Sequence, residues 1–253
     1  MKSVSVIFRT TELGRNELAF ASHLASKLGW PLLVQYTLPE CCLSEKDVEE
    51  EVTRIGSFVR EIATGNIPRE IVFESLTGGA ITTMSEGSIL VSNEYADSRR
   101  LFSVLAPRLE TEVQIGPEWN ICIPTSDNNK SLKTIEAGIL LATVLDIGVI
   151  FYHTTWHKPG LESDDPQNHV CNEAKQVLDT AQEIAQKYRV PARSVVETAP
   201  SVPEGISRCA QREGCALIVM SRANTVGRGG YADETKKRTT VPILVLGPRE
   251  AGR

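Results

Sequence analysis

A glycine-rich segment near the end of the chain has the composition of an anion-binding loop. TVGRGG (225–230) offers three residues without a Cβ and one guanidinium group, namely Gly227, Gly229, Gly230 and Arg228. Residues without a Cβ let backbone N–H groups approach an anion closely, and a guanidinium group adds charge-assisted hydrogen bonds. We therefore predict an anion or nucleotide pocket here. The alternative is a flexible surface loop that binds nothing, which glycine-rich segments also form.

Polar residues at the ends of two predicted strands could complete that pocket. Ligands of parallel α/β sheets lie beyond the carboxyl ends of the strands, where the strand order reverses. Polar residues follow the strand that ends at Met220, and others follow the strand that ends at Pro124. The candidate binding residues are Pro124, Thr125, Ser126, Asp127, Met220, Ser221, Arg222, Asn224, Gly227, Arg228, Gly229 and Gly230.

Other reactive residue types do not fit a known catalytic or metal-binding motif. Zinc ligands of all three types occur in and around one polar loop: His153, His157, Asp164, Asp165, His169 and Cys171. Their spacing matches no established zinc motif, so we predict no metal site. The nucleophile-elbow, Walker A and H-E-x-x-H patterns are missing, and the six cysteines include no C-x-x-C. We therefore predict no catalytic residues, and we expect the thiols to be reduced.

The elements that must position these residues occur twice along the chain. A predicted strand and helix at 4–8 and 14–28 are repeated at 120–124 and 129–146. Each helix has one apolar face. Each also ends at a glycine suited to the left-handed turn of a helix C-terminus, Gly29 in the first copy and Gly148 in the second.

The rest of the chain continues the repeat. The first copy goes on with a strand, a helix and three strands at 31–37, 44–63, 71–76, 88–98 and 111–117. The second copy follows the same order, with one more helix, at 149–154, 169–189, 194–199, 203–214, 216–225 and 241–248. This alternation predicts two tandem α/β units of Rossmann-like type, each a doubly wound, five-stranded parallel sheet. We place them at 1–117 and 118–253.

The first predicted unit lacks the glycine-rich loop of the second. At the carboxyl ends of its equivalent predicted strands it has Arg9, Thr10, Thr11, Ser92 and Asn93. We therefore predict that it serves as a scaffold or a dimerisation half, so the protein could form a homodimer. The segment between the units is very short, and we expect the two units to pack on each other.

The charge balance narrows the range of partners. The chain has 27 Lys and Arg residues against 32 Asp and Glu, a net charge of -5. That balance provides no basic field for nucleic acid or an anionic membrane, so the expected ligand is a small molecule or an anion. No segment approaches the roughly 20 apolar residues of a membrane span. The N-terminus has no signal-peptide pattern, so we expect a cytoplasmic protein.

Three segments in combination resemble the universal stress protein family in its tandem form. They are ICIPTSD (121–127), ALIVMSRANTVGRGG (216–230) and VPILVL (241–246). In that family the first strand ends in a V-P-x-D-like turn. The fourth reads L-I-V-M-G and precedes a G-x2-G-x9-G-S/T phosphate loop. The resemblance implies an adenine nucleotide alpha hydrolase-like fold, a role in the stress response and ATP binding.

The chain departs from the family pattern at the nucleotide site. Ser126 stands where the family has its aspartate, Ser221 and Asn224 replace the first two loop glycines, and Gly230 replaces the serine or threonine. The sequence thus favours a non-catalytic binding or regulatory protein with a degenerate site, whose ligand is unknown but could be ATP or another adenine nucleotide. The alternative is an enzyme that hydrolyses a nucleotide or transfers an adenylyl or phosphoryl group. Its base would come from Asp127, Glu94 or the loop histidines.

Overall fold

The chain divides into two compact units, Met1–Gln114 and Ile115–Arg253. The boundary that we predict between 117 and 118 lies outside the described residues. The computed structural model describes residues 3–8, 10–39, 44–63, 69–74, 89–92, 102–105, 119–126, 131–155, 171–221 and 231–246.

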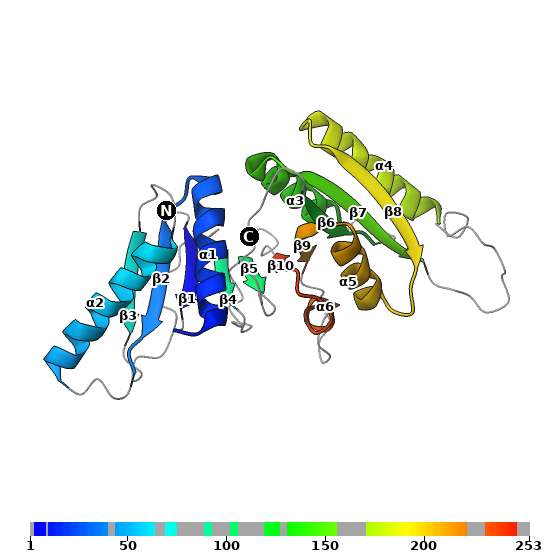
Figure 1. Ribbon diagram of the computed structural model, residues 1–253. Helices are drawn as coiled ribbons and strands as arrows, with labels where there is room; N and C mark the ends of the chain where they lie inside the picture. Colours follow the sequence, from blue (N-terminus) through cyan, green and yellow to red (C-terminus); the bar gives the residue numbers. More distant parts are fainter. Residues whose placement is uncertain are drawn as a thin grey trace, which may run out of the picture. The chain divides into compact units, whose positions relative to one another are not determined.

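The first unit is built on a parallel sheet whose strand order differs from their order in the chain. Its elements are β1 (Val4–Phe8), α1 (Glu12–Leu28), β2 (Leu32–Thr37), α2 (Glu45–Ile62), β3 (Arg69–Glu74), β4 (Ile89–Ser92) and β5 (Phe102–Leu105). Each strand pairs in parallel with its neighbours, in the order β3-β2-β1-β4-β5 (Figure 1).

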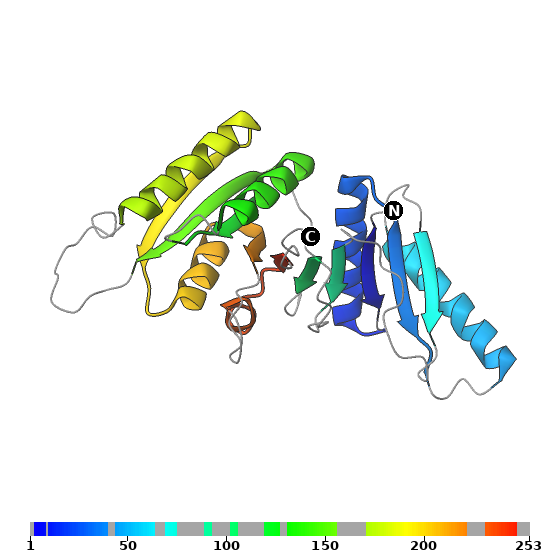
Figure 2. The same cartoon turned by 180° about the vertical axis from the view of Figure 1, so that it is seen from behind.

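The second unit repeats this architecture. Its elements are β6 (Asn120–Pro124), α3 (Leu132–Leu145), β7 (Gly148–Thr155), α4 (Asn172–Lys187), β8 (Ala192–Thr198), α5 (Val202–Arg212), β9 (Cys215–Ser221), α6 (Tyr231–Lys236) and β10 (Ile243–Leu246). The parallel order β8-β7-β6-β9-β10 corresponds strand by strand to that of the first unit. Helices α3 and α4 cover one face of this sheet, and α5 and α6 cover the other (Figures 1 and 2). The predicted tandem α/β fold is confirmed.

The structure adds one strand to the sequence prediction and corrects one helix end. The added strand is Phe102–Leu105, which we did not predict, while the predicted strand 111–117 lies outside the described residues. Helix α3 ends at Asp146, which takes the left-handed conformation at φ 57°, and not at Gly148. Gly148 instead begins β7, where a Cβ would lie 2.5 Å from Asn120 Oδ1. Close packing, not a helix cap, requires that glycine.

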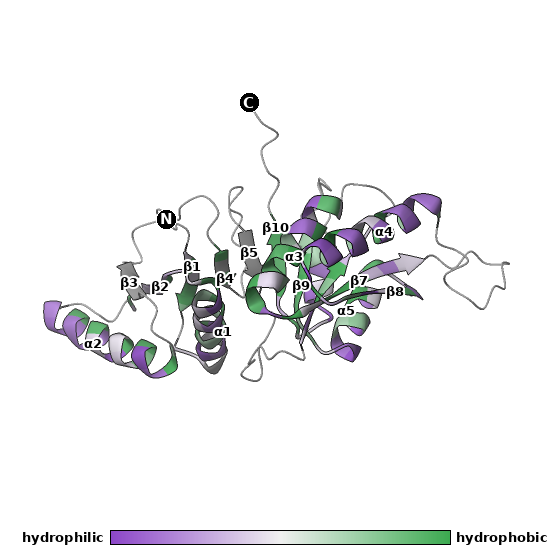
Figure 3. Cartoon of the chain, turned by 90° about the horizontal axis from the view of Figure 1, so that it is seen from above, coloured by the Kyte–Doolittle hydropathy of each residue, from purple (hydrophilic) through white to green (hydrophobic). Residues whose placement is uncertain are grey.

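The helices begin at residues suited to capping, and polar and apolar residues are distributed unevenly over the elements. Thr11 and Ser201 cap α1 and α5 with their side-chain oxygens, and Ser44 forms a capping box with Asp47 at the start of α2. In the second unit the hydrophobic colour gathers on α3 and the central strands, while α4 is largely hydrophilic on its outer side (Figure 3). Among the described residues, no helix is both long enough and apolar enough to cross a membrane.

Candidate ligand-binding site

A cavity of about 300 Å³ opens at the carboxyl ends of β6, β7 and β9 in the second unit. Its described lining comprises Pro124, Thr125, Ser126, Ser131, Thr134, Tyr152, His153, Thr154, Val202, Ile206, Met220, Ser221 and Tyr231. The position beyond the carboxyl ends of parallel strands is where sheets of this kind bind their ligands. The volume lies at the lower end of the range for small-molecule pockets.

Five of the predicted binding residues lie in this lining: Pro124, Thr125, Ser126, Met220 and Ser221. The other seven are outside the described residues, namely Asp127, Arg222, Asn224, Gly227, Arg228, Gly229 and Gly230. Ser221 and Tyr231 bracket that glycine-rich segment in the chain, and both of them line the cavity.

The first strand of the unit is held to the second by Thr125. Its backbone N–H donates to the Tyr152 carbonyl at 2.8 Å, which extends the strand pairing one residue past Pro124. Its hydroxyl lies 3.2 Å from the same carbonyl and 3.2 Å from Nδ1 of His153. The histidine is buried, with 4% of its surface exposed. These contacts fix an imidazole and a hydroxyl in the wall of the cavity.

Tyr152 extends from β7 beneath helix α5. A Cβ on Gly205 would lie 2.1 Å from the Tyr152 hydroxyl oxygen, so only a glycine leaves room for that side chain. No described residue is in hydrogen-bond geometry with this hydroxyl. Burial is the main cause that raises the pKa of Tyr152 to about 12; the polar side chain of neighbouring Thr154 opposes the shift, and the negative charge of Glu197 adds to it. The phenol is therefore protonated at neutral pH.

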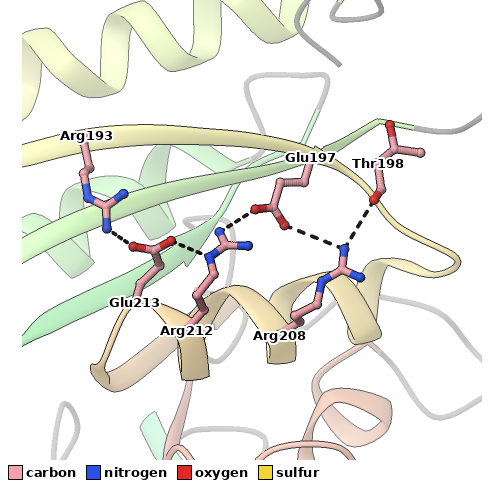
Figure 4. Close-up of polar contacts among 6 residues, drawn as sticks. All are labelled: Arg193, Glu197, Thr198, Arg208, Arg212 and Glu213. Carbon is pink, nitrogen blue, oxygen red and sulfur yellow. Dashed lines mark hydrogen bonds and ion pairs between the residues drawn. The ribbon is translucent and has the colours of Figure 1, made fainter. Parts of the chain in front are cut away.

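Helix α5, which contributes Val202 and Ile206 to the lining, is joined to strand β8 by a chain of charged groups (Figure 4). Arg212 pairs with Glu197 and, through Nε at 2.7 Å, with Glu213. Glu213 also pairs with Arg193, and Arg208 donates to the Thr198 carbonyl at 3.3 Å. Hydrogen bonds from Arg193 and Arg212 hold the pKa of Glu213 below its usual value, against the opposing effect of burial. The network fixes the helix over the sheet.

Sequence reasoning missed the residues that come from β7 and from the starts of the helices. They are Ser131, Thr134, Tyr152, His153, Thr154, Val202, Ile206 and Tyr231. The second strand lies beside the first in such a sheet, so the polar end of 148–155 was a usable signal for the β7 residues. No comparable signal in the sequence marked the lining residues that come from α3 and α5. His153 belongs to the cavity, and no group of three or more described His, Cys, Asp or Glu residues is placed to hold a metal ion.

The chain resembles known proteins in structure and not detectably in sequence. No protein-family model matches it, and neither does any curated protein. A universal stress protein from Archaeoglobus fulgidus DSM 4304 aligns over 98% of this chain and 97% of its own, with 9% identity and a TM-score of 0.61.

Two structures from Pseudomonas aeruginosa align almost as fully. The protein of strain UCBPP-PA14, provisionally assigned to the universal stress proteins, matches at 12% identity and a TM-score of 0.58, over 97% of this chain and 93% of its own. A functionally unknown protein of strain PAO1 matches at 12% identity and a TM-score of 0.57, over 98% of this chain and 93% of its own. Over its full length the chain therefore has the fold of the universal stress proteins.

Proposed function

We propose that the chain is a cytoplasmic, stress-associated binding or regulatory protein of the universal stress protein type, without catalytic activity. In this proposal the second unit binds an adenine nucleotide or another small anion in the cavity. The observation that carries the proposal is the cavity itself, which lies at the carboxyl ends of β6, β7 and β9. The likeness in fold to universal stress proteins supports the biological role.

The ends of the glycine-rich segment support a role in anion binding. Ser221 ends β9 and Tyr231 begins α6, and both residues line the cavity. The nine residues between them include three glycines and two arginines, a composition suited to phosphate oxygens. We infer that this segment contacts the charged end of the ligand.

Two measurements on the full-length chain test the proposal. The protein is purified under native conditions and any retained small molecule is identified by mass spectrometry. The protein is then titrated with ATP, ADP and AMP by calorimetry and thermal shift. We expect one of them to bind with an affinity of millimolar or better. An absence of both heat and thermal shift at millimolar ligand would contradict the proposal.

A matched pair of variants locates the binding. Ser221→Trp places an indole at the rim of the cavity and should abolish binding. Ser194→Trp places the same group on an exposed position of β8, outside the lining, and should leave binding intact. Equal affinities in the two variants would place the ligand elsewhere. Nucleotide turnover that is lost in Asp127→Ala would favour the alternative of an enzyme.

A further inference from the structure

Strand β8 forms an edge of the sheet in the second unit. It pairs with β7 on one side, and no described strand pairs with its other side (Figures 1 and 2). Its residues, Ala192–Thr198, include no proline and no glycine, the residues that weaken strand pairing. An open edge presents a row of backbone N–H and C=O groups to which another strand can add. The second unit therefore has a surface suited to strand pairing.

The direction of the backbone groups along this edge follows from one hydrogen bond. The Val149 N–H donates to the Pro191 carbonyl at 2.8 Å, in agreement with the pairing of Val149 with Ala192. In a strand, the N–H and C=O groups of one residue point to the same side, and the side alternates from residue to residue. The odd-numbered residues of β8 therefore direct their backbone groups to β7. The even-numbered residues direct theirs to the outer edge.

The side chains of β8 carry opposite charges at equal distances from its centre. Arg193 and Glu197 lie two residues on either side of Val195, on the face of the sheet that α5 covers (Figure 4). Their side chains are 53% and 21% exposed. On the other face, Gln182 of α4 donates to the Ser194 hydroxyl at 3.0 Å. A two-fold axis beside Val195 would therefore bring Arg193 of each copy opposite Glu197 of the other.

The backbone and the charges select the same antiparallel register. In that register Ser194 of one copy lies opposite Val196 of the other, and both direct their backbone groups outward, so they can exchange hydrogen bonds. Arg193 and Glu197 form the closer, non-hydrogen-bonded pairs, in which opposite charges are favourable. A register centred on Arg193 or on Glu197 would place like charges opposite each other. Arg193 retains donors for a second copy, because Glu213 contacts only one of its nitrogens and a guanidinium group has five N–H donors.

We propose that two copies of the chain associate through β8, which pairs antiparallel with β8 of the second copy about a two-fold axis beside Val195. The interface is isologous, because the same surface of each copy meets itself. It lies in the second unit and is distinct from the dimerisation that the sequence predicts for the first. Pairing of one strand with another buries a small area, so the dimer should be weak, with a dissociation constant on the order of 1–100 μM.

Sedimentation equilibrium of the full-length chain, from about 1 to about 500 μM, measures the association. We expect a reversible equilibrium between monomer and dimer. Ser194→Pro removes an outward N–H that β7 does not use, a position that tolerates proline, and should weaken the dimer at least about fivefold. Ser194→Ala keeps that N–H and should associate like the wild type. A wild-type chain that stays monomeric, or a dimer that Ser194→Pro does not weaken, would overturn the proposal.

A charge exchange between two variants tests the register. Arg193→Glu and Glu197→Arg each place like charges opposite each other in their own dimers, so each variant alone should associate at least about tenfold more weakly than the wild type. An equimolar mixture restores both opposite-charge pairs and should associate within about threefold of the wild type. A change in folding within one copy cannot produce this recovery, because each copy still carries its own substitution. Variants that dimerise normally alone, or a mixture that does not recover, would contradict the interface.

Discussion

Replacement of Gly205 by alanine tests how closely helix α5 packs on the tyrosine in the cavity wall. The new Cβ would lie 2.1 Å from the Tyr152 hydroxyl oxygen and 2.8 Å from the Cβ of Ala199. Both neighbours are buried, at 1% and 7% exposed, so neither can move into solvent without loss of packing. Overpacking of this kind costs about 1–3 kcal/mol. Alanine recovers about 1 kcal/mol through its higher helix propensity.

The net expectation for Gly205→Ala is therefore a loss of up to about 2 kcal/mol. For a unit of this size that corresponds to a fall in Tm of about 2–4 °C per kcal/mol. The matched control is Gly56→Ala on helix α2. A Cβ there would meet only Arg60 Nη2, at an ordinary 3.7 Å. That variant should be neutral or more stable than the wild type by up to about 1 kcal/mol.

A double-mutant cycle with Tyr152→Phe identifies the cause of the loss. The tyrosine hydroxyl has no described hydrogen-bond partner, so its removal alone should change stability by less than about 1 kcal/mol. In the Gly205→Ala background the same change removes the 2.1 Å contact. About half of the lost stability should be recovered, because the contact of the new Cβ with Ala199 remains. The free energies of unfolding are measured by urea denaturation. Strict additivity of the two substitutions would refute the argument that the hydroxyl lies beneath α5.

Three further perturbations have defined outcomes. Gly138→Ala on α3 would bring a Cβ to 2.5 Å from Ile123 Cδ1, and Ile123→Val, which removes that methyl group, should restore part of the lost Tm in a thermal melt. Glu213→Gln should destabilise the chain by about 0.5–1 kcal/mol at neutral pH. The folded pKa of Glu213 lies below its unfolded value of about 4.3, so its carboxylate stabilises the fold at pH values above the unfolded pKa. The difference in stability between Glu213→Gln and the wild type should therefore vanish as the pH falls through the folded pKa. Urea unfolding at several pH values measures this difference, and a difference that does not change with pH would contradict the argument. A thiol reagent should modify the exposed Cys171 quickly in the native chain and the buried thiols only after unfolding. Hydrogen bonds with Cys209 and Cys215, together with burial, raise the pKa of Cys122 and so disfavour its reactive thiolate. The count is made with Cys41 and Cys42 replaced by serine, and fast reaction of more than one thiol would contradict the burial of Cys122, Cys209 and Cys215.

The sequence specified most of the fold because its signals are local. Apolar runs such as 217–220 marked buried strands, and the single apolar face of 14–28 marked a helix that packs on one side. Repetition of the same element order strengthened each assignment. The strand at 102–105 was missed because it is only four residues long, too short for a clear periodic signal. Its pairing with β4 identifies it as a strand.

The candidate site was predicted only in part, because its wall combines residues from distant elements. Pro124 and Ser221 could be named from the rule that ligands lie at strand ends. Ile206 could not, because its contribution depends on how α5 lies across the sheet. His153 was considered as a metal ligand from its neighbours in sequence, whereas the structure places it beside Thr125 in the cavity wall.

The sequence by itself indicated the alternation of strands and helices in two α/β units and the end of the sheet at which a ligand should lie, whereas the order of the strands within each sheet came from the structure. The alternation and the ligand end follow from hydrophobic periodicity and from the geometry of parallel sheets, which act over a few residues or hold for all such folds. The tertiary structure alone decided the chemistry of the cavity. Tyr152, Thr134 and Val202 meet there from β7, α3 and α5, and their meeting depends on packing, such as the fit of Tyr152 against Gly205. No pattern along the chain records that fit, because its partners are 53 residues apart in sequence (205 − 152).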